Sequence, residues 1–376
     1  MSRPLTILQM LPELDVGGVE QGTVDSAIAY ARLGHASIVM SGGGRRVPEL
    51  IAAGVIHHEL PVHKKRLGNV LRLIPKVARI IKASGVDVVH ARSRLPAWIG
   101  YYAARKAGVP FVTTVHGYYS PHFYSRIMAR GERVIAVSHP VAEYANASLD
   151  ADPATLRVIY RGIDPAPYEL TWGAERKAAL RAELGIPEAA RVVAIVGRIT
   201  RLKGHGVFLE AMARVCAALP DVTPLVIGAV PPKKAAYGDE LKRQTERLGL
   251  AGRVVFAGSR SDVPDVLKVC DLLVSASTQP ESFGRTLVEA MATGIPVVAT
   301  AHGGALDIVK GETCGRLVQP GNPEELAGAV AEILSLPDGG HALGAAGRAR
   351  VRALFTVEHM VSDTIAVYRE LVRGEG

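Results

Sequence analysis

Two basic residues stand five positions apart directly after a predicted strand. Residues 197–204 read Gly-Arg-Ile-Thr-Arg-Leu-Lys-Gly and follow the apolar run Val192–Val196. Open α/β sheets bind ligands at the carboxyl ends of their strands, where Arg198 and Lys203 would emerge. Either residue alone is typical of a solvated loop, but a forked guanidinium and a compact ammonium together suit a diphosphate. The pair therefore predicts a phosphate-binding position.

Two glutamates form a second candidate group. Residues 280–289 read Pro-Glu-Ser-Phe-Gly-Arg-Thr-Leu-Val-Glu and run from a predicted strand into a predicted helix. Eight residues of helix separate Glu281 from Glu289 by roughly 12 Å, beyond the about 5–10 Å of a carboxylate pair acting on one bond. We expect them to hold hydroxyls at different parts of one long polar ligand. The alternative is a surface residue at Glu289 and a partner of the helix dipole at Glu281.

Two predicted helix starts carry backbone groups that could bind phosphate. Gly17 and Gly18 separate the first strand from the first helix, which lets a phosphate approach the backbone and the N–H groups of the helix N-terminus. A tight turn explains a Gly-Gly pair equally well. The free N–H groups near Phe283–Arg285, at the second helix start, would meet a phosphate between the two glutamates, which makes Ser282, Phe283 and Gly284 candidate donor-binding residues.

Alternating apolar runs and amphipathic stretches predict the elements that position these residues. Continuous apolar runs with helical spacers indicate parallel sheets covered on both faces. The first-half strands are expected at Thr6–Met10, Ala36–Ser41, Val55–Leu60, Val86–Ala91, Phe111–Val115, Val134–Val137 and Leu156–Ile159, with a first helix at Glu20–Arg32. The second-half strands are expected at Val192–Val196, Thr223–Ile227, Val254–Ala257, Leu272–Ser275, Pro296–Ala299 and Gly315–Val318, with helices at Gly206–Leu219 and Gly284–Thr293.

The predicted domain division follows a break in this alternation. Turn formers and prolines in 161–172 predict a hinge. The N-terminal domain then spans 1–165 and the C-terminal domain 173–355, and a final helix near 357–372 is expected to pack back on the first domain. The fold class is α/β, with two doubly wound Rossmann-like domains facing across a ligand-binding cleft.

Length and composition support this division. At about 100–200 residues per domain, 376 residues with 48% hydrophobic content predict two domains. Three scattered cysteines are too few for a disulfide framework or a zinc site. The sequence has no apolar run of about 18 residues and no apolar stretch behind its first residues, which predicts a cytoplasmic protein.

Considered together, these motifs resemble one enzyme family. Glu-x7-Glu, Arg-x4-Lys and the N-terminal Gly-Gly resemble the family 4 retaining glycosyltransferases of the GT-B fold over essentially the whole chain. The stretches around His90, His116-Gly117 and residues 128–138 look most like lipopolysaccharide-core sugar transferases. This resemblance implies transfer of a hexose, with mannose or glucose favoured, from a nucleotide diphosphate sugar to a lipid-linked or lipopolysaccharide-core glycan. It also implies no cofactor and no metal.

The resemblance implies a role for each matched position. Arg198 and Lys203 would neutralise the diphosphate of the donor and of the leaving group. Glu281 would hold hydroxyls of the donor sugar, and Glu289 would bind the ribose. Gly18 would present its N–H to the phosphates, and His116 would lie near the donor sugar, although a buried structural histidine is the simpler interpretation of His116 alone. The nucleobase would rest on backbone near Phe256, Ala257 and Gly258.

Two positions depart from the family pattern. Arg161 stands in the sequence Tyr-Arg-Gly-Ile-Asp, where relatives more often carry Asn. Asp307 stands after His302-Gly303-Gly304, where the family usually shows Glu. Neither change removes an essential charge, but both bear on the contacts to the donor sugar.

The net charge of +8 is concentrated in the first half of the chain. Residues 1–170 hold 20 Lys and Arg against 13 Asp and Glu, whereas residues 171–376 hold 24 against 23. Residues 63–82 contain seven basic residues, Lys64, Lys65 and Arg66 among them, and no acidic one. Their apolar residues follow helical spacing, at Leu67, Leu71, Ile74, Ala78 and Ile81, and Leu73, Val77 and Ile80 widen the apolar side.

This basic helix has two interpretations. A basic amphipathic helix is typical of a membrane-surface element, which would place the protein on the inner face of the cytoplasmic membrane. The alternative is a core-facing stripe with solvated charges behind it. If the first interpretation holds, Arg92 and Arg94 would join Lys64, Lys65 and Arg66 in contacting an anionic lipid surface or a glycolipid acceptor.

Three other functions predict different features. A nucleotide-sugar epimerase on the same fold would convert its substrate without an acceptor, and a phosphorylase would need a pyridoxal-binding lysine, for which the sequence has no marker. A nucleic-acid-binding protein fits the pI of about 9.4 but predicts aromatic stacking platforms. An aromatic content of 5% with two tryptophans argues against nucleic acid as a partner.

Overall fold

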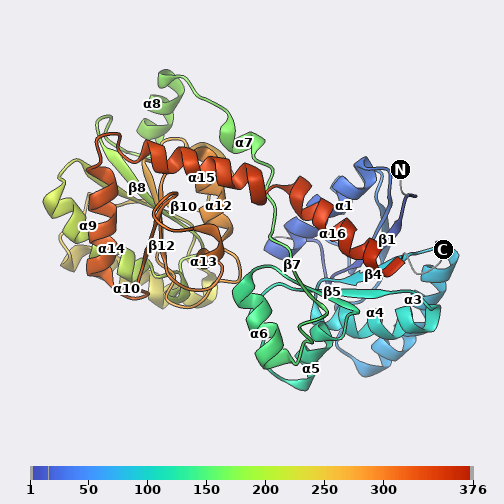
Figure 1. Cartoon of the computed structure of the whole chain (residues 1–376). Coiled ribbons are helices and arrows are strands. Elements are labelled where there is room, and N and C mark those ends of the chain that lie inside the picture. Colours follow the sequence, from blue (N-terminus) through green and yellow to red (C-terminus); the bar gives the residue numbers. More distant parts are fainter. Residues whose placement is uncertain (1–2, 16, 373–376) are drawn as a thin grey trace. The chain divides into compact units, whose positions relative to one another are not determined.

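The computed structural model describes residues 3–15 and 17–372, which form two compact units. The N-terminal unit contains the chain up to Gly162 together with the segment that begins at Val357, and the C-terminal unit is Ile163–Thr356 (Figure 1). The chain therefore passes between the units twice, and Ile163 and Thr356 pair at these passages in an isolated parallel β-bridge. The segment 161–172, expected to be a hinge, is assigned from Ile163 onward to the C-terminal unit and contains the short helix α7 (Ala166–Glu169).

The N-terminal unit contains a seven-stranded sheet in the order β3-β2-β1-β4-β5-β6-β7, with every neighbouring pair parallel. Its central strands are almost entirely buried, as expected for apolar runs covered on both faces. The strands are β1 (Thr6–Met10), β2 (Ala36–Ser41), β3 (Ile56–Glu59), β4 (Val88–Ala91), β5 (Phe111–Val115), β6 (Arg133–Ala136) and β7 (Leu156–Val158).

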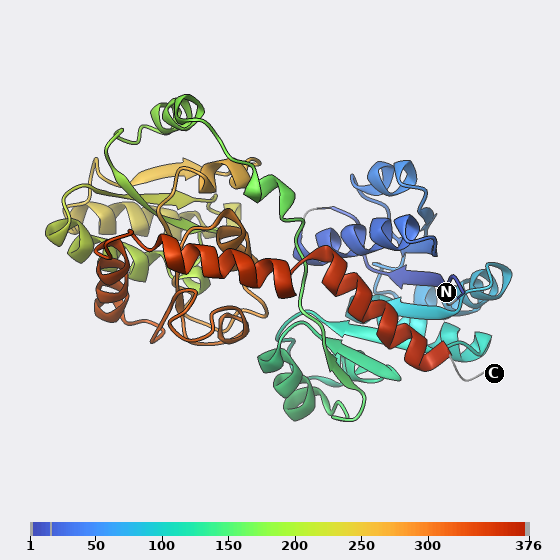
Figure 2. The ribbon, with the colours of Figure 1, turned by 45° about the horizontal axis from the view of Figure 1, so that its top comes forward.

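Helices cover both faces of this sheet (Figures 1 and 2). One group contains α1, which packs against α2 and α16, and the other contains α3, which packs against α4. The helices of the unit are α1 (Gly18–Arg32), α2 (Val47–Ala52), α3 (Leu67–Ala83), α4 (Arg94–Ala107), α5 (Phe123–Arg126), α6 (His139–Leu149) and α16 (Val357–Val372), with a 3-10 turn at Ile127–Ala129.

The C-terminal unit contains a six-stranded sheet in the order β10-β9-β8-β11-β12-β13, again parallel throughout. In this order the strand sequence reverses between β8 and β11, which is the topological switch point where such sheets bind ligands. The strands are β8 (Arg191–Val196), β9 (Val222–Ile227), β10 (Val255–Gly258), β11 (Leu272–Ser275), β12 (Val297–Thr300) and β13 (Arg316–Val318).

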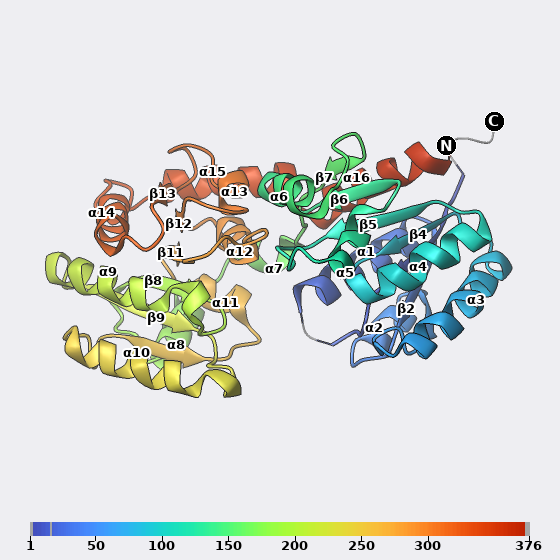
Figure 3. The same ribbon diagram turned by 90° about the horizontal axis from the view of Figure 1, so that it is seen from below.

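The helices of the C-terminal unit also lie on both faces of its sheet (Figure 3). Helix α14 packs against α9, and α12 packs against α15. Beyond α7, the helices are α8 (Ala174–Glu183), α9 (His205–Ala218), α10 (Ala235–Arg247), α11 (Val263–Leu267), α12 (Arg285–Thr293), α13 (Ala305–Ile308), α14 (Pro323–Leu334) and α15 (His341–Leu354), with 3-10 turns at Arg201–Lys203 and Pro232–Lys234.

Helix α16 forms part of the core of the N-terminal unit. Its residues Met360, Val361, Ile365 and Tyr368 belong to one buried cluster with Leu5, Ile7, Val88 and Val112 of the sheet. The buried hydroxyl of Tyr368 lies 2.6 Å from Nδ1 of His90 and 3.3 Å from the hydroxyl of Tyr30. Because these polar atoms are buried, their mutual hydrogen bonds offset the cost of removing them from water.

The predicted fold class, two parallel-sheet Rossmann-like domains, is confirmed. The predicted strands agree with the observed ones to within one or two residues, because continuous apolar runs mark buried parallel strands well. At the start of α14, Asn322 and Glu325 have the residue types and spacing of a capping box. Asn322 Oδ1 accepts the N–H of Glu325 as expected, but the Glu325 carboxylate accepts the N–H of Gln319.

Candidate functional site

Lys203 and Glu281 meet at the carboxyl edge of the C-terminal sheet. Lys203 ends the turn after β8, and Glu281 lies in the loop after the neighbouring strand β11. Lys203 Nζ donates to Glu281 Oε2 over 2.7 Å, and both side chains are partly buried. The other carboxylate oxygen, Oε1, accepts a hydrogen bond from the hydroxyl of Ser277. Two predicted site residues, 78 positions apart, are thus brought together in one ion pair.

Two glycines allow the site loops to approach this closely. Gly204 has φ of +69°, and a Cβ there would collide with the carbonyl oxygen of Ala276 after β11. Gly304, after β12, packs against the backbone of Phe283, and its N–H donates to the carbonyl of Glu281 over 2.8 Å. The loops after β8, β11 and β12 are therefore fixed to one another by backbone contacts. This rigidity sets the position of Glu281.

Arg198 lies on the surface after β8. Its side chain is exposed, and among the described residues it makes no hydrogen bond or ion pair. An unpaired guanidinium retains all five of its N–H donors for a ligand. The second predicted phosphate ligand is thus available, whereas Lys203 would have to share its ammonium with Glu281.

Glu289 lies one turn inside α12 with only 9% of its surface exposed. Its Oε1 accepts a hydrogen bond from Nε of Arg285 at 2.8 Å, and this ion pair keeps the buried carboxylate paired. Burial, with Glu289 as the next largest cause, raises the pKa of the neighbouring Tyr168 phenol. The predicted interpretation of Glu289 as an exposed helix residue is therefore wrong.

The start of α12 contains the other predicted donor-loop residues. Ser282, Phe283 and Gly284 precede Arg285, the first helical residue, and Gly284 has φ of +106°. The ring of Phe283 is buried edge-on against Phe355. Helix α12 therefore directs its N-terminus toward the Glu281 loop, where the helix dipole favours an anion.

A cavity of about 460 Å³ lies beside the same sheet edge. It lies at the carboxyl ends of β8, β9 and β10, and it is lined by Ile199, Val230, Pro231, Phe256 and Gly258 among others. A volume of this size is within the range of small-ligand pockets. The backbone at Phe256 and Gly258, predicted to support a nucleobase, therefore borders a mostly apolar cavity.

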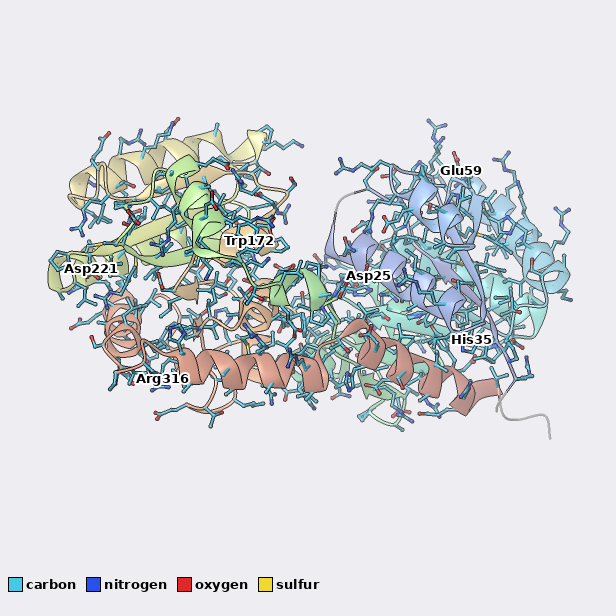
Figure 4. All side chains as sticks on the ribbon, turned by 90° about the horizontal axis from the view of Figure 1, so that it is seen from above. Asp25, His35, Glu59, Trp172, Asp221 and Arg316 are labelled. Carbon is cyan, nitrogen blue, oxygen red and sulfur yellow. The ribbon has the colours of Figure 1, made fainter. Side chains whose placement is uncertain are left out.

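A second cavity of about 690 Å³ lies at the opposite edge of this sheet. Its lining includes Trp172 (Figure 4), Arg191 at the start of β8 and Asp271 just before β11. The guanidinium of Arg176 stacks over the Trp172 ring at 3.6 Å, and Arg191 is paired with Asp221 over 2.6 Å. Because ligands of open α/β sheets bind at the carboxyl edge, this cavity is not the predicted donor position.

In the N-terminal unit, Gly17 and Gly18 lie at the start of α1. Gly17 is the N-cap residue, and a Cβ there would collide with the carboxylate of Glu20. The carbonyl of Gly18 accepts a hydrogen bond from Nη2 of Arg161. Val16, which precedes Gly17, falls outside the described part of the chain. Arg161, noted as a departure from the family pattern, therefore contacts the predicted phosphate-binding glycine.

His116 follows β5 and is partly buried. Burial lowers the pKa of His116 well below its usual range, and the cations Arg92 and Arg161 lower it further. Nη1 of Arg161 lies 3.5 Å from Nδ1 of His116. Because a guanidinium only donates, Nδ1 accepts and the ring proton lies on Nε2, which is buried without a partner among the described residues. His116 can therefore donate a hydrogen bond to a ligand.

Arg92 and Arg94 do not form a lipid-facing patch. Arg92 is only 6% exposed, and its Nη1 donates to the amide oxygen of Gln9 over 3.0 Å. Arg94 is half-buried, and its guanidinium stacks over the rings of Tyr119 and Tyr124 at 5.1 and 5.5 Å. The burial of Arg92 contradicts its expected contact with a membrane surface, and the stacking of Arg94 on two tyrosine rings turns that guanidinium toward the protein.

Helix α3 buries the later part of the predicted apolar side but not its first residues. Leu73, Val77, Ala78 and Ile81 are buried, whereas Leu67 and Leu71 are 72% and 60% exposed. Lys64, Lys65 and Arg66 precede the helix and are exposed as well. The first turns of α3 therefore present apolar and basic side chains to solvent. Within residues 3–15 and 17–372, no helix is long and apolar enough to cross a bilayer.

Sequence reasoning missed several residues that hold these groups. Ser277 and Arg285 contact the two predicted glutamates, and the hydroxyl of Tyr119 accepts the backbone N–H of His116 over 3.2 Å. A signal existed for Arg285, which stands four residues before Glu289 at helical ion-pair spacing. Ser277 and Tyr119 act through loop geometry, which residue type and spacing do not reveal.

Comparisons with known proteins match both halves of the chain. Residues 16–167 match the family described as Glycosyltransferase Family 4, and residues 176–350 match Glycosyl transferases group 1. The D-inositol 3-phosphate glycosyltransferase of Segniliparus rotundus is 32% identical over 307 residues, which cover 77% of this chain and 67% of that protein.

Two solved structures are similar over almost the whole chain. A glycosyltransferase from Rickettsia africae is 30% identical with a TM-score of 0.91, and the match covers 100% of each chain. HepE from Anabaena, solved in complex with UDP, is 27% identical with a TM-score of 0.86, covering 98% of this chain and 100% of that one. A further structure of HepE contains UDP-glucose.

Proposed function

Because the chain belongs to the GT-B glycosyltransferases of group 1 and family 4, we propose that it is a retaining, metal-independent hexosyltransferase that uses a nucleotide diphosphate sugar. The observation that carries this proposal is the Lys203–Glu281 ion pair at the carboxyl edge of the C-terminal sheet, beside exposed Arg198 and the 460 Å³ cavity. The cavity would hold the nucleobase, the cations the diphosphate, and Glu281 the sugar. Glu289 would bind the ribose.

The reaction would break the bond between the anomeric carbon and the diphosphate oxygen. The electron pair would stay on that oxygen, and the positive charges of Arg198 and Lys203 would stabilise it as it departs. The acceptor hydroxyl would attack the same face of the sugar, and its proton would pass to the departing phosphate oxygen. The anomeric configuration would thus be retained.

Glu281 serves this reaction better as a positioning group than as a nucleophile. One of its oxygens accepts from Lys203 and the other from Ser277. A carboxylate held by two donors is less reactive toward the anomeric carbon, because attack would have to break those hydrogen bonds. The same two contacts fix its orientation toward sugar hydroxyls.

We infer that the donor is a UDP-sugar, with glucose or mannose as the transferred hexose. HepE, at 27% identity, is solved with UDP and with UDP-glucose, which supports this donor class here. An epimerase on the same fold would need no acceptor, so acceptor dependence separates the two activities.

For the acceptor, we propose a lipid-linked or lipopolysaccharide-core glycan at the inner face of the cytoplasmic membrane. The exposed basic and apolar residues before and within the first turns of α3 support this choice, since they suit an anionic lipid surface. A second candidate is a small phosphorylated polyol, because a 32% identical relative is named D-inositol 3-phosphate glycosyltransferase.

A thermal-shift panel of nucleotide sugars tests the donor proposal. The full-length chain is expected to be stabilised by one UDP-sugar, by about 2.7 kcal/mol at 100 times its Kd. The same sugar should then release UDP only when an acceptor is present. Conversion of the nucleotide sugar without acceptor would favour the epimerase, and no shift with any nucleotide sugar would refute the proposal.

A further inference from the structure

A small cavity in the N-terminal unit is lined by cationic and neutral polar groups. Its polar lining consists of Ser26, His90, Arg92, Thr114, His116, Arg161 and Thr364, and apolar side chains such as Ile135 and Met360 complete it. Its volume of about 20 Å³ has room for one water-sized group, such as a single oxygen of a larger ligand. No Asp or Glu is among the residues that line it.

The two guanidinium groups of this cavity converge beside Gly22 of α1. A Cβ at Gly22 would lie 2.6 Å from Nη2 of Arg161 and 3.5 Å from Nη2 of Arg92. The two nitrogens therefore lie no farther apart than the sum of these distances. Gly22 leaves the space that both guanidinium groups use, and any larger residue would displace the end of Arg161.

The charge of Arg92 is deeply buried and incompletely satisfied. Arg92 is 6% exposed, and its Nε has no partner among the described residues. Burial lowers the pKa of Arg92. The hydroxyls of Tyr30 and Tyr368 oppose this shift, and the carboxylate of Asp25 on α1 (Figure 4) opposes it least. A buried cation beside a second cation is costly unless an anion compensates both. Nε2 of His116, also buried and unpartnered, adds a neutral donor to the same cavity.

We propose that Arg92 and Arg161, with Nε2 of His116, form a subsite for an acidic group of the acceptor. The proposal rests on the proposed function, because it assumes a sugar acceptor. A carboxylate of an acidic sugar and a phosphate on a sugar or polyol share the required chemistry, since forked guanidinium groups bind either. The donor diphosphate has its own candidate cations, Arg198 and Lys203, in the other unit.

Anion binding to the full-length chain tests the subsite directly. Orthophosphate and glucuronate serve as probes in thermal-shift titrations, in a Lys203→Ala background that weakens the donor position. At least one probe is expected to raise Tm, and Arg161→Gln should weaken its apparent affinity about tenfold or more, as for loss of a hydrogen bond to a charged group. Arg161→Lys, which keeps the charge, should retain part of the binding.

Arg105→Gln is the matched control. Arg105 is an exposed arginine of the same unit, on α4, and contacts Tyr101. The Arg105→Gln variant should bind the probe with the same affinity as the parent protein. No stabilisation by either probe, or equal stabilisation of the parent and Arg161→Gln, would overturn the subsite.

Acceptor kinetics distinguish the source of the acidic group. Inositol 3-phosphate is compared with inositol, and methyl glucuronide with methyl glucoside, by acceptor-dependent UDP release. The preferred acidic compound should have the higher kcat/KM, and Arg161→Gln should raise its KM about tenfold or more with a smaller change in kcat. If Arg161→Gln instead weakens UDP binding tenfold without affecting acceptor KM, the cations serve the donor and the proposal is wrong.

Failure of this proposal and failure of the proposed function give different results. A chain that binds no nucleotide sugar would refute the glycosyltransferase proposal, even if orthophosphate still stabilises it through Arg161. A chain that transfers sugar but shows no anion binding dependent on Arg161 would refute the acceptor subsite alone.

Discussion

Lys203 Nζ lies 2.7 Å from Glu281 Oε2, and this ion pair joins the loops after two adjacent strands of the C-terminal sheet. Because Ser277 holds the second carboxylate oxygen, the ammonium and the carboxylate are fixed relative to one another before any ligand binds. Preorganised charges of this kind stabilise developing charge with little reorganisation. The pair therefore offers a cation for phosphate and an acceptor for sugar hydroxyls in one rigid unit.

Replacing either partner should abolish transfer. Lys203→Ala removes the charge proposed to stabilise the leaving diphosphate, and Glu281→Ala removes the sugar contact and leaves the lysine unpaired. Each is expected to lower kcat/KM by about 100-fold or more, as for loss of one oxyanion-type donor. Steady-state kinetics with circular dichroism of the purified variants provide the measurement.

Arg201 and Glu240 supply the matched controls for these two changes. They form an exposed ion pair at 2.5 Å, with Arg201 two residues from Lys203. Arg201→Ala and Glu240→Ala remove the same charges from the same unit, and exposed pairs contribute about 0–1 kcal/mol. Both variants should retain parent activity. Near-parent turnover in Lys203→Ala or Glu281→Ala would contradict the site assignment.

Glu289→Gln should weaken binding of the nucleotide itself. The Glu289 carboxylate is buried and paired with Arg285, and a ribose contact would not require the transferred sugar. UDP and UDP-glucose are therefore expected to lose affinity equally, by about tenfold. Calorimetric titration checks this, with Glu332→Gln, whose carboxylate pairs with Arg316 (Figure 4), as the control. A loss confined to UDP-glucose would argue against the ribose role.

Gly304→Ala should disrupt the Glu281 loop. A Cβ at Gly304 would collide with the backbone of Phe283, so the segment that carries Glu281 must shift. We expect about 1–3 kcal/mol of destabilisation and loss of nucleotide-sugar binding. Gly328 in α14 has nothing within 4 Å of an added Cβ, so Gly328→Ala should raise stability by about 0.5–1 kcal/mol. Urea unfolding and thermal shift with donor check both; unchanged donor affinity in Gly304→Ala would count against this loop.

Stability should fall as the pH drops from about 6.5 to 4, in part because of His205. This residue is 1% exposed, and burial lowers its pKa from 6.5 to about 4. In that window the unfolded chain binds a proton that the folded chain does not, so acid favours unfolding by up to about 3 kcal/mol. The pKa values of His90 and His116 are also lowered by burial, which gives the same sign.

His205→Asn tests that contribution through the pH slope rather than the absolute stability. Urea unfolding midpoints measured between pH 7.5 and 4.5 should decline less steeply in the variant than in the parent. His341, which starts α15 and is exposed, provides a control in His341→Asn, whose slope should match the parent. Equal slopes in His205→Asn and the parent would show that His205 titrates normally.

Charge reversal before α3 should weaken binding to anionic vesicles. Lys64, Lys65 and Arg66 are exposed, and each basic residue near such a surface contributes about 1 kcal/mol. The triple change to Glu is expected to lower vesicle affinity more than tenfold at low salt, less at high salt. The same change at exposed Lys233, Lys234 and Lys242 is the control for net charge. Equal binding of both variants to anionic vesicles would show that α3 has a structural role only.

The parallel sheets and their ligand-binding edge could be predicted from the sequence because buried strands leave continuous apolar runs. Arg198, Lys203 and Glu281 were located by their places after such runs. Their partners were not predictable in the same way. The Lys203–Glu281 pair depends on Gly204 and Gly304 bringing loops together, which is a property of three-dimensional packing and not of spacing.

The errors in the N-terminal unit have a common cause. Leu67 and Leu71 fit a helical stripe, but burial on α3 begins only at Leu73, so the first turns contribute no core residue. Arg92 has the residue type of a surface position, yet it follows the central strand β4 and is covered. Pattern and residue type indicate which way a side chain could face, but the neighbouring elements decide whether anything covers it.

The place of α16 has a consequence for synthesis on the ribosome. The C-terminal unit is one continuous stretch and can fold as soon as it has emerged, whereas the first-made sheet lacks its last covering helix until residues after Val357 appear. At about 5–20 residues per second, the nascent chain would expose apolar residues such as Leu5 and Val112 for about 10–40 seconds while the intervening unit is made. The half that is translated first is therefore completed last, and it is the half that depends most on protection by chaperones.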